Sequence, residues 1–208
     1  MFDAVRIPSN ELFAVLTATS FAAGMNVYAT VATLGLLARA GMIPLPAALH
    51  LLSSWYVIAS SAVLFLVEFF ADKVPVFDLL WNALHTFVRI PVAALLAYAA
   101  TAQLSSGMQL LATLLGGAIA LAAHGGKTAV RAVVTPYPEP FSNLTLSLGE
   151  DALAVFLTWF ATRHPYWAAM IALAFVLVIV VLMRWVVGAL RSMFRRTREE
   201  IDLLFKGV

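Results

Sequence analysis

Long apolar runs, separated by short segments that contain proline or glycine, constrain this chain more than any other feature of its sequence. A transmembrane α-helix needs about 20 mainly apolar residues to cross a bilayer core of about 30 Å. Apolar runs near this length occupy residues 10–38, 46–71, 91–105, 108–135, 147–162 and 165–190. The sequence therefore predicts an all-α polytopic membrane protein with about six transmembrane helices, folded as a single domain over residues 1–208.

The composition agrees with a membrane location and excludes several other classes of protein. Hydrophobic side chains make up 62% of the chain and charged ones only 12%, with a mean hydropathy of +0.93, whereas a soluble domain carries about 25% charged residues. There is no cysteine, which excludes a disulfide framework, an iron–sulfur site and a thiol nucleophile. The formal net charge of +2 is too balanced to indicate a nucleic-acid partner. The lipid bilayer is the first partner that the sequence predicts.

Basic residues near the ends of the apolar runs predict the orientation. An excess of Lys and Arg marks the cytoplasmic side of a membrane protein. The end of the last run carries such a cluster, namely Arg184, Arg191, Arg195, Arg196 and Arg198. With six crossings both termini are expected in the cytoplasm, and only Arg39 and Arg163 lie outside. The first run is expected to remain as a helix, because Glu11 stands where a signal peptide carries positive charge.

Two segments combine a polar and an apolar face at helical spacing. Between the second and third runs, Asp78, Asn82, His85 and Arg89 recur every three or four residues, with apolar side chains on the other side. This spacing predicts an amphipathic helix packed beneath the bundle. The second segment is an amphipathic C-terminal tail over residues 188–208, interpreted either as a helix in the headgroup region or as a solvated extension of the sixth helix.

Prolines precede the apolar runs in a similar order in the two halves of the chain. Pro-x-Pro precedes the second and the fifth runs, at Pro44 and Pro138, and a single proline opens the third and the sixth, at Pro91 and Pro165. Because each half contains an odd number of spans, the second half would lie upside down relative to the first. The sequence thus predicts a 3+3 inverted repeat over residues 10–105 and 108–190, a plan that many secondary transporters share.

Ionisable and amide side chains inside or beside the apolar runs are the candidate substrate-binding residues, because such groups are costly in lipid and mark functional sites by default. They are Asn26, Glu68, Asp72, Asp78, His85, Arg89, His124, Lys127, Arg131, Asn143, Glu150 and Asp151. Glu68 and Asp72 share a helix face and are expected to meet Glu150 and Asp151 across a water-accessible cavity. Carboxylates gathered this closely do not all ionise together, so proton-linked activity is expected.

Lys127 and Arg131 lie one helical turn apart and repel each other, which implies an anionic partner. Gly125 and Gly126 precede them and are expected to interrupt the helix, freeing backbone N–H groups that could join the two cations in binding an oxyanion. The partner is either the anionic group of a substrate or neighbouring carboxylates such as Glu150. In the second case the charges form a self-neutralising network of salt bridges.

The sequence predicts no catalytic, cofactor-binding or metal-binding residues. The four histidines, His50, His85, His124 and His164, lie on separate segments without the i, i+4 spacing of a helical zinc site. No phosphate-binding loop, dinucleotide fingerprint or Gly-x-Ser-x-Gly motif occurs.

Three groups of residues resemble a known family. They are Ala23-Gly24-Met25-Asn26-Val27-Tyr28-Ala29-Thr30; Glu68-Phe69-Phe70-Ala71-Asp72-Lys73-Val74-Pro75 with Asp78, Trp81, His85 and Arg89; and Pro138-Glu139-Pro140-Phe141-Ser142-Asn143 with Ser147, Glu150 and Asp151. Over roughly residues 12–190 the chain resembles the bacterial membrane family catalogued as domain of unknown function 4126. The resemblance implies that the polar positions belong to one site in a protein of the bacterial inner (plasma) membrane. It implies no chemistry, because that family is defined by sequence.

These features favour a small membrane transporter or lipid-translocating protein with a polar, ionisable site near the midplane, coupled to protons and handling a small anionic solute or lipid. The alternatives are an integral-membrane enzyme that acts on a lipid headgroup and a structural membrane subunit. Because one chain of 208 residues forms a thin bundle, a homo-oligomer is expected.

Overall fold

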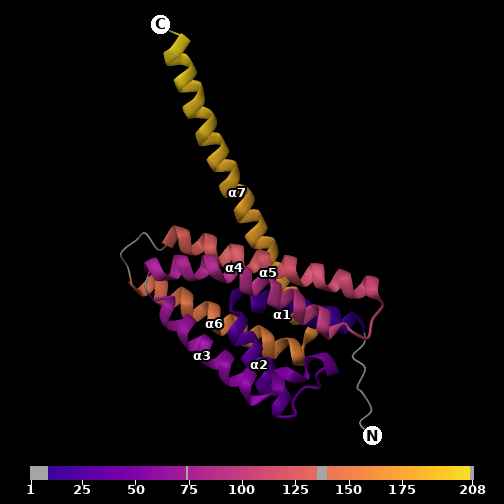
Figure 1. The fold of residues 1–208 in the computed structure, drawn as a ribbon. Helices are drawn as coiled ribbons and strands as arrows, with labels where there is room; N and C mark the ends of the chain where they lie inside the picture. The colour runs from indigo at the N-terminus through magenta and orange to yellow at the C-terminus, as the bar shows by residue number, and fades with distance from the viewer. Residues whose placement is uncertain (1–8, 74, 135–139, 207–208) are drawn as a thin grey trace.

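The computed structural model describes residues 9–73, 75–134 and 140–206, apart from some side chains within these ranges. Every element of this described part is helical, which confirms the predicted all-α class. In chain order the elements are α1 (Ser9–Met25), α2 (Val27–Arg39), the 3₁₀ helix η1 (Ala47–Ser53), α3 (Trp55–Ala71), α4 (Pro75–Ala100), α5 (Ser106–Val134), α6 (Pro140–Arg163) and α7 (Pro165–Lys206). Figure 1 shows α4 and α5 side by side and α7 leaving the bundle at a steep angle to them.

The described helices give the chain the character of a multi-pass membrane protein, with fewer crossings than the sequence predicts. Four stretches are long and apolar enough to span a bilayer: Leu80–Ala100, Ser106–Arg131, Leu144–Arg163 and Pro165–Trp185. A fifth is obtained if η1 and α3, which meet at an angle of 62°, are counted as one bent span. Four or five candidate spans therefore replace the six predicted ones.

The first predicted crossing, over residues 10–38, yields no candidate span, because it is divided at Asn26. The two resulting helices, α1 and α2, have 17 and 13 residues, each short of the about 20 that a span requires. The backbone of Asn26 is extended, and its side-chain oxygen accepts a hydrogen bond of 2.9 Å from the Ala29 backbone N–H. This is an N-cap, so α2 begins as a new helix at this point.

The corresponding break predicted at Gly125 and Gly126 is wrong, because α5 runs through both residues as one helix. Gly126 serves close packing instead: a Cβ placed there would lie 2.6 Å from Cδ1 of Ile179 on α7. Since α1 is interrupted and α5 is not, the described helices do not show the predicted 3+3 inverted repeat.

Two predicted amphipathic helices are also not present as separate elements. The polar segment after the second run forms the first half of α4, which continues through Pro91 to Ala100. Proline is tolerated inside a membrane helix where neighbouring groups compensate for its missing N–H. The C-terminal tail continues α7 without a break to Lys206, since no proline interrupts the sequence after Pro165; this agrees with the interpretation of the tail as an extension of the last membrane helix.

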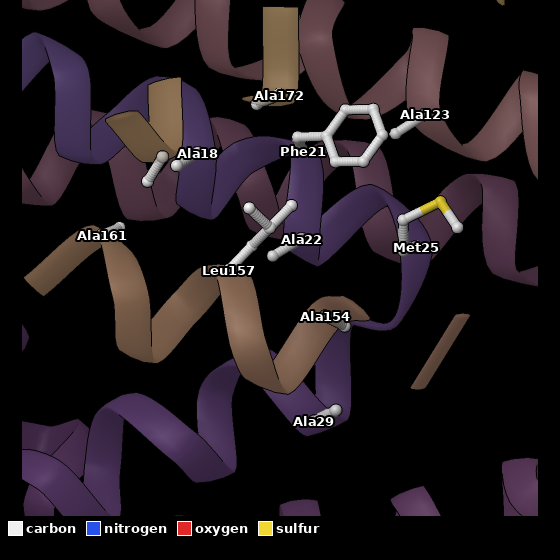
Figure 2. Close-up of a cluster of buried hydrophobic side chains, with 11 residues drawn as sticks. Ala18, Phe21, Ala22, Met25, Ala29, Ala123, Ala154, Leu157, Ala161 and Ala172 are labelled. Atoms are coloured by element: carbon white, nitrogen blue, oxygen red, sulfur yellow. The ribbon is translucent and has the colours of Figure 1, made fainter. Parts of the chain in front are cut away.

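Small side chains fill the centre of the bundle, where α1 packs against α5, α6 and α7. Figure 2 shows Phe21 and Met25 of α1 and Leu157 of α6 surrounded by alanines of these helices. Small residues let membrane helices approach closely. At Gly24 α1 approaches α5 closely, because a Cβ there would lie 2.5 Å from the Ala120 carbonyl oxygen of α5. This packing holds the end of α1, and with it Asn26, against α5.

The two ends of the bundle differ. α1 begins and α2 ends at the same end, because Leu12 of α1, Leu34 of α2 and Pro44 line one cavity. The pair therefore forms a V with Asn26 at its apex. We call this end, which also contains the α6–α7 turn at Arg163, the cavity end. The opposite end, where α3 ends and α4 begins, is called the network end.

Candidate functional site

The ammonium group of Lys127 on α5 lies at the centre of a buried cluster of charges. Its Nζ is 3.2 Å from Glu150, 3.3 Å from Asp72 and 3.5 Å from Glu68. It also donates to the Met25 carbonyl at the end of α1, at 3.5 Å. Lys127 is only 3% exposed. One cation thus joins carboxylates from α3 and α6 to the end of α1.

Arg131, one turn further along α5, holds two of the same carboxylates. Its Nη2 lies 2.5 Å from Glu150 and 2.9 Å from Asp72, and its Nε lies 3.2 Å from Glu150. The guanidinium fork binds Glu150 through two nitrogens, the geometry in which Arg forms its strongest carboxylate pairs. Ser147 of α6 adds a hydroxyl donor to Asp72 at 3.5 Å.

Arg89, in the middle of α4, extends the cluster toward His124. It forms an ion pair with Glu68 and donates from Nη1 to Nδ1 of His124 at 2.9 Å. Because arginine is only a donor, Nδ1 of His124 accepts and the ring hydrogen lies on Nε2, which is 2.8 Å from the Thr86 hydroxyl. Asn82 also accepts from Arg89, at 3.3 Å. His124 is therefore a neutral acceptor for a buried arginine.

His85 forms the edge of the cluster. Its Nδ1 lies 2.7 Å from the Trp81 carbonyl oxygen, so Nδ1 carries the hydrogen, and its Nε2 accepts from the Tyr28 hydroxyl at 2.9 Å. Both ring nitrogens are thus engaged. Tyr28 comes from the first turn of α2, which ties the apex of the V to α4.

Asn26 connects the break between α1 and α2 to α6. Its side-chain oxygen caps α2, and its Nδ2 donates to Oδ1 of Asp151 at 2.8 Å. Asn26 is fully buried, and Asp151 is 6% exposed. The same amide therefore begins one helix and binds a carboxylate of another.

The structure brings ten of the twelve predicted site residues into this continuous region, which we call the charged network. They are Asn26, Glu68, Asp72, His85, Arg89, His124, Lys127, Arg131, Glu150 and Asp151. The side chains of Asp78 and Asn143 lie outside the described residues. The expected separation of the carboxylates by a water-accessible cavity is replaced by direct contact with Lys127 and Arg131.

Sequence reasoning left four contact residues out of the candidate site: Tyr28, Asn82, Thr86 and Ser147. The sequence places Asn82 on a polar helix face, and Tyr28 and Ser147 belong to the groups that carry the family resemblance, although the list of candidate residues omits all three. Thr86 carries no signal, since a threonine in an apolar run is ordinary.

The described side chains of the charged network do not balance in charge. Four carboxylates (Glu68, Asp72, Glu150 and Asp151) face three bases (Arg89, Lys127 and Arg131), which leaves one formal negative charge. Several buried polar atoms also have no hydrogen-bond partner among the described residues, namely Glu68 Oε2, Asp72 Oδ1, Arg89 Nε and Asp151 Oδ2. A buried polar atom without a partner is costly. The network can therefore accept at least one further proton or ligand group.

Lys73 follows α3, outside the candidate spans, at the edge of the charged network. Its Nζ donates to the Phe69 carbonyl at 2.8 Å and lies over the Phe69 ring. Burial lowers the pKa of Lys73, against the opposing effect of the carboxylates of Asp151 and Asp72. Its charge is therefore stabilised less than that of an exposed lysine.

A cavity of about 590 Å³ lies at the cavity end of the bundle. Its walls are mainly apolar and come from the first half of α1, the end of α2, the loop before η1 and the α6–α7 turn. Polar side chains among its lining residues are Glu11, Thr19, Thr162, Arg163, His164 and Tyr166. Its volume is in the range of small-molecule sites, about 300–1,000 Å³.

Comparisons with known proteins give one match. The family model described as a domain of unknown function (DUF4126) matches residues 13–185, which include all of the charged network. No curated protein and no solved structure matches the chain.

Proposed function

We propose that this chain, which belongs to the DUF4126 family, is a small membrane transporter that couples the movement of an anion to the movement of protons through the charged network. The observation that carries the proposal is that, among the described side chains of the network, four buried carboxylates face three buried bases. Ionisable groups are kept inside a membrane bundle at a considerable free-energy cost, and they mark ion and proton pathways.

Competition for Lys127 supplies a coupling mechanism. Three carboxylates lie within 3.5 Å of its ammonium group. A proton taken up by a carboxylate of the network removes its excess negative charge, which otherwise repels an incoming anion. An anionic group of a solute, such as a phosphate or a carboxylate, can then compete with the three carboxylates for Lys127. Proton uptake therefore creates the anion site, and proton release closes it.

Arg131 gives that site its geometry. Its guanidinium binds Glu150 through Nε and Nη2, and the same fork fits a phosphate or carboxylate of the solute. Lysine offers only a point charge. Arg131→Lys is therefore expected to weaken anion binding although the charge is kept.

Access from two sides is required for transport, and the fold offers a candidate for each. The cavity extends along the first half of α1 toward Asn26. Thr19, which lines the cavity, lies two turns before Asn26. The other side is the network end, where we propose that the arginine-rich end of α7 faces the cytoplasm of a bacterial cell. The proposal does not depend on an inverted repeat.

A structural role is the second candidate, because every base of the network already contacts a carboxylate. A purely structural network tolerates exchange of its charges. If Lys127→Glu is rescued by Glu150→Lys in both folded yield and function, the network only holds helices together. A headgroup enzyme is less well supported, since the hydrogen bonds of His85 occupy both of its ring nitrogens.

The proposal is tested with the full chain in proteoliposomes that contain a pH-sensitive dye. Inorganic phosphate, sulfate, succinate and lactate are added outside in turn, and phosphatidylglycerol exchange between leaflets is followed separately. At least one anion or the lipid is expected to move together with protons. Arg131→Lys should reduce this flux at least tenfold, whereas the matched control Arg39→Lys, outside the network, should not. Equal flux in empty liposomes and protein-containing ones would refute the proposal.

A further inference from the structure

Asp151 differs from the other three carboxylates of the charged network in the kind of partner it has. Glu68, Asp72 and Glu150 all contact Lys127. Asp151 forms no ion pair among the described residues; its Oδ1 accepts from the neutral amide of Asn26 at 2.8 Å. Its Oδ2 is buried and has no hydrogen-bond partner in the described part of the chain. The excess negative charge of the network is therefore localised on this carboxylate.

The charged groups around Asp151 act on it in opposite directions. Lys127 from α5 favours the ionised carboxylate, and so does Lys73, which follows α3, but neither forms an ion pair with it among the described residues. Glu68 and Asp72 oppose ionisation. The remaining ionisable neighbours are Glu150 on α6 and Arg131 on α5, which bind each other. α1 and α2 contribute the neutral groups of Asn26 and Tyr28, and residues 165–183 of α7 carry no charged side chain.

Along α6, Asp151 lies between Ser147, which contacts Asp72, and the residues that line the cavity. Ser147, one turn before it, donates to Asp72 of the network. Thr158 and Thr162 lie two and three turns after it on the same helix face; Thr158 is fully buried, and Thr162 lines the cavity. A single face of α6 thus carries polar groups from one region to the other.

We propose that Asp151 is the residue that takes up and releases the coupled proton, at Oδ2. This inference rests on the proposed function and deepens it by assigning the proton to one atom. On uptake, a proton bonds to Oδ2 and Oδ1 continues to accept from Asn26, so the hydrogen bond at the helix break is kept. The described network then has three ionised acids for three bases. On release the proton leaves Oδ2 and the negative charge returns.

The proton site is tested without any transported solute, by infrared spectroscopy of the full chain in phosphatidylethanolamine–phosphatidylglycerol vesicles. Spectra are recorded between pH 4 and pH 9. The wild-type protein should show a C=O band of a protonated carboxyl group that forms on acidification. Asp151→Asn should abolish this band, because asparagine has the same shape and no titratable proton. Glu11→Gln, which removes a carboxylate at the cavity, is the matched control and should retain the band.

If Asp151→Asn does not fold, a second variant, Asn26→Ser, tests the assignment of the proton to Asp151. Asn26→Ser keeps an N-cap for α2, but its shorter side chain removes the amide donor to Asp151. Loss of a donor to the ionised carboxylate favours protonation, so the pH at which half the band has formed should rise. An unchanged midpoint in Asn26→Ser, or persistence of the band in Asp151→Asn, would overturn the assignment. If the band behaves as expected but no solute moves with protons, the proposed function fails and the proton site stands.

Discussion

Arg131 of α5 binds Glu150 of α6 through both Nε and Nη2, and the same guanidinium reaches Asp72 at 2.9 Å. All three side chains are nearly or fully buried. The pair therefore connects two helices inside the bundle with charges that water cannot screen. Removing Arg131 would leave Lys127 as the basic partner that Glu150 and Asp72 share among the described residues, so buried negative charge would be left undercompensated, which is the costly case.

Arg131→Gln is expected to lower the free energy of unfolding by about 3–5 kcal/mol. Thermal unfolding in mild detergent, followed by the fluorescence of the five tryptophans, measures the change. The double variant Arg131→Gln/Glu150→Gln should recover a large part of the loss, because it leaves one charge fewer without a partner. Additive losses in this double-mutant cycle would show that the two groups are not coupled.

Replacing the ion pair of Arg89 and Glu68 by apolar residues separates stability from function. In Arg89→Met/Glu68→Met both charges are removed together, and such replacements are often neutral or stabilising by about 1–4 kcal/mol. We expect a folded protein of at least wild-type thermal stability. If the network is a transport site, the same variant should lose proton-coupled flux in proteoliposomes. Full flux in this variant would favour the purely structural role.

The close approach of α1 and α5 is tested by two glycine substitutions. In Gly24→Ala the new Cβ would lie 2.5 Å from the Ala120 carbonyl oxygen, so the helices must move apart, at a cost of about 1–3 kcal/mol. Gly125→Ala is the matched control on α5, since no described atom outside its own stretch of helix lies within 4 Å of its Cβ position. The control should be neutral or stabilised by up to about 1 kcal/mol, because alanine favours the helix. Equal unfolding temperatures for the two variants would contradict the packing.

The V formed by α1 and α2 predicts a membrane topology that differs from six crossings. Asn10 donates to the Tyr166 hydroxyl at the cavity end, so a cysteine at Asn10 should react from the same side as one at Met42. A cysteine at Arg191 should react only from the opposite side. The natural absence of cysteine makes each label specific. If Asn10→Cys and Arg191→Cys react from the same side, the chain has an even number of crossings, and the five-crossing topology in which α1 and α2 form a V and η1 with α3 spans the membrane is wrong.

The sequence by itself determined the class of the protein and most of the residues in the charged network. Long apolar runs are sufficient to predict membrane helices, because the free energy of placing a helix in lipid is a sum over its own residues. The same reasoning identified Glu68, Lys127 and Arg131, since an ionisable group in an apolar run must face protein or water. Ten of the twelve predicted residues lie in one region of the described structure.

Only the tertiary structure decided where helices break, which charges pair and which carboxylate lacks a basic partner. The chain breaks at Asn26, where a local N-cap is joined by a hydrogen bond to Asp151, whereas α5 runs intact through Gly125 and Gly126 and packs against α7 at Gly126. The contacts of Asn26 with Asp151 and of Gly126 with Ile179 join segments more than 50 residues apart in sequence. Local spacing places residues on a common helix face, but it does not specify the neighbouring helix that this face meets.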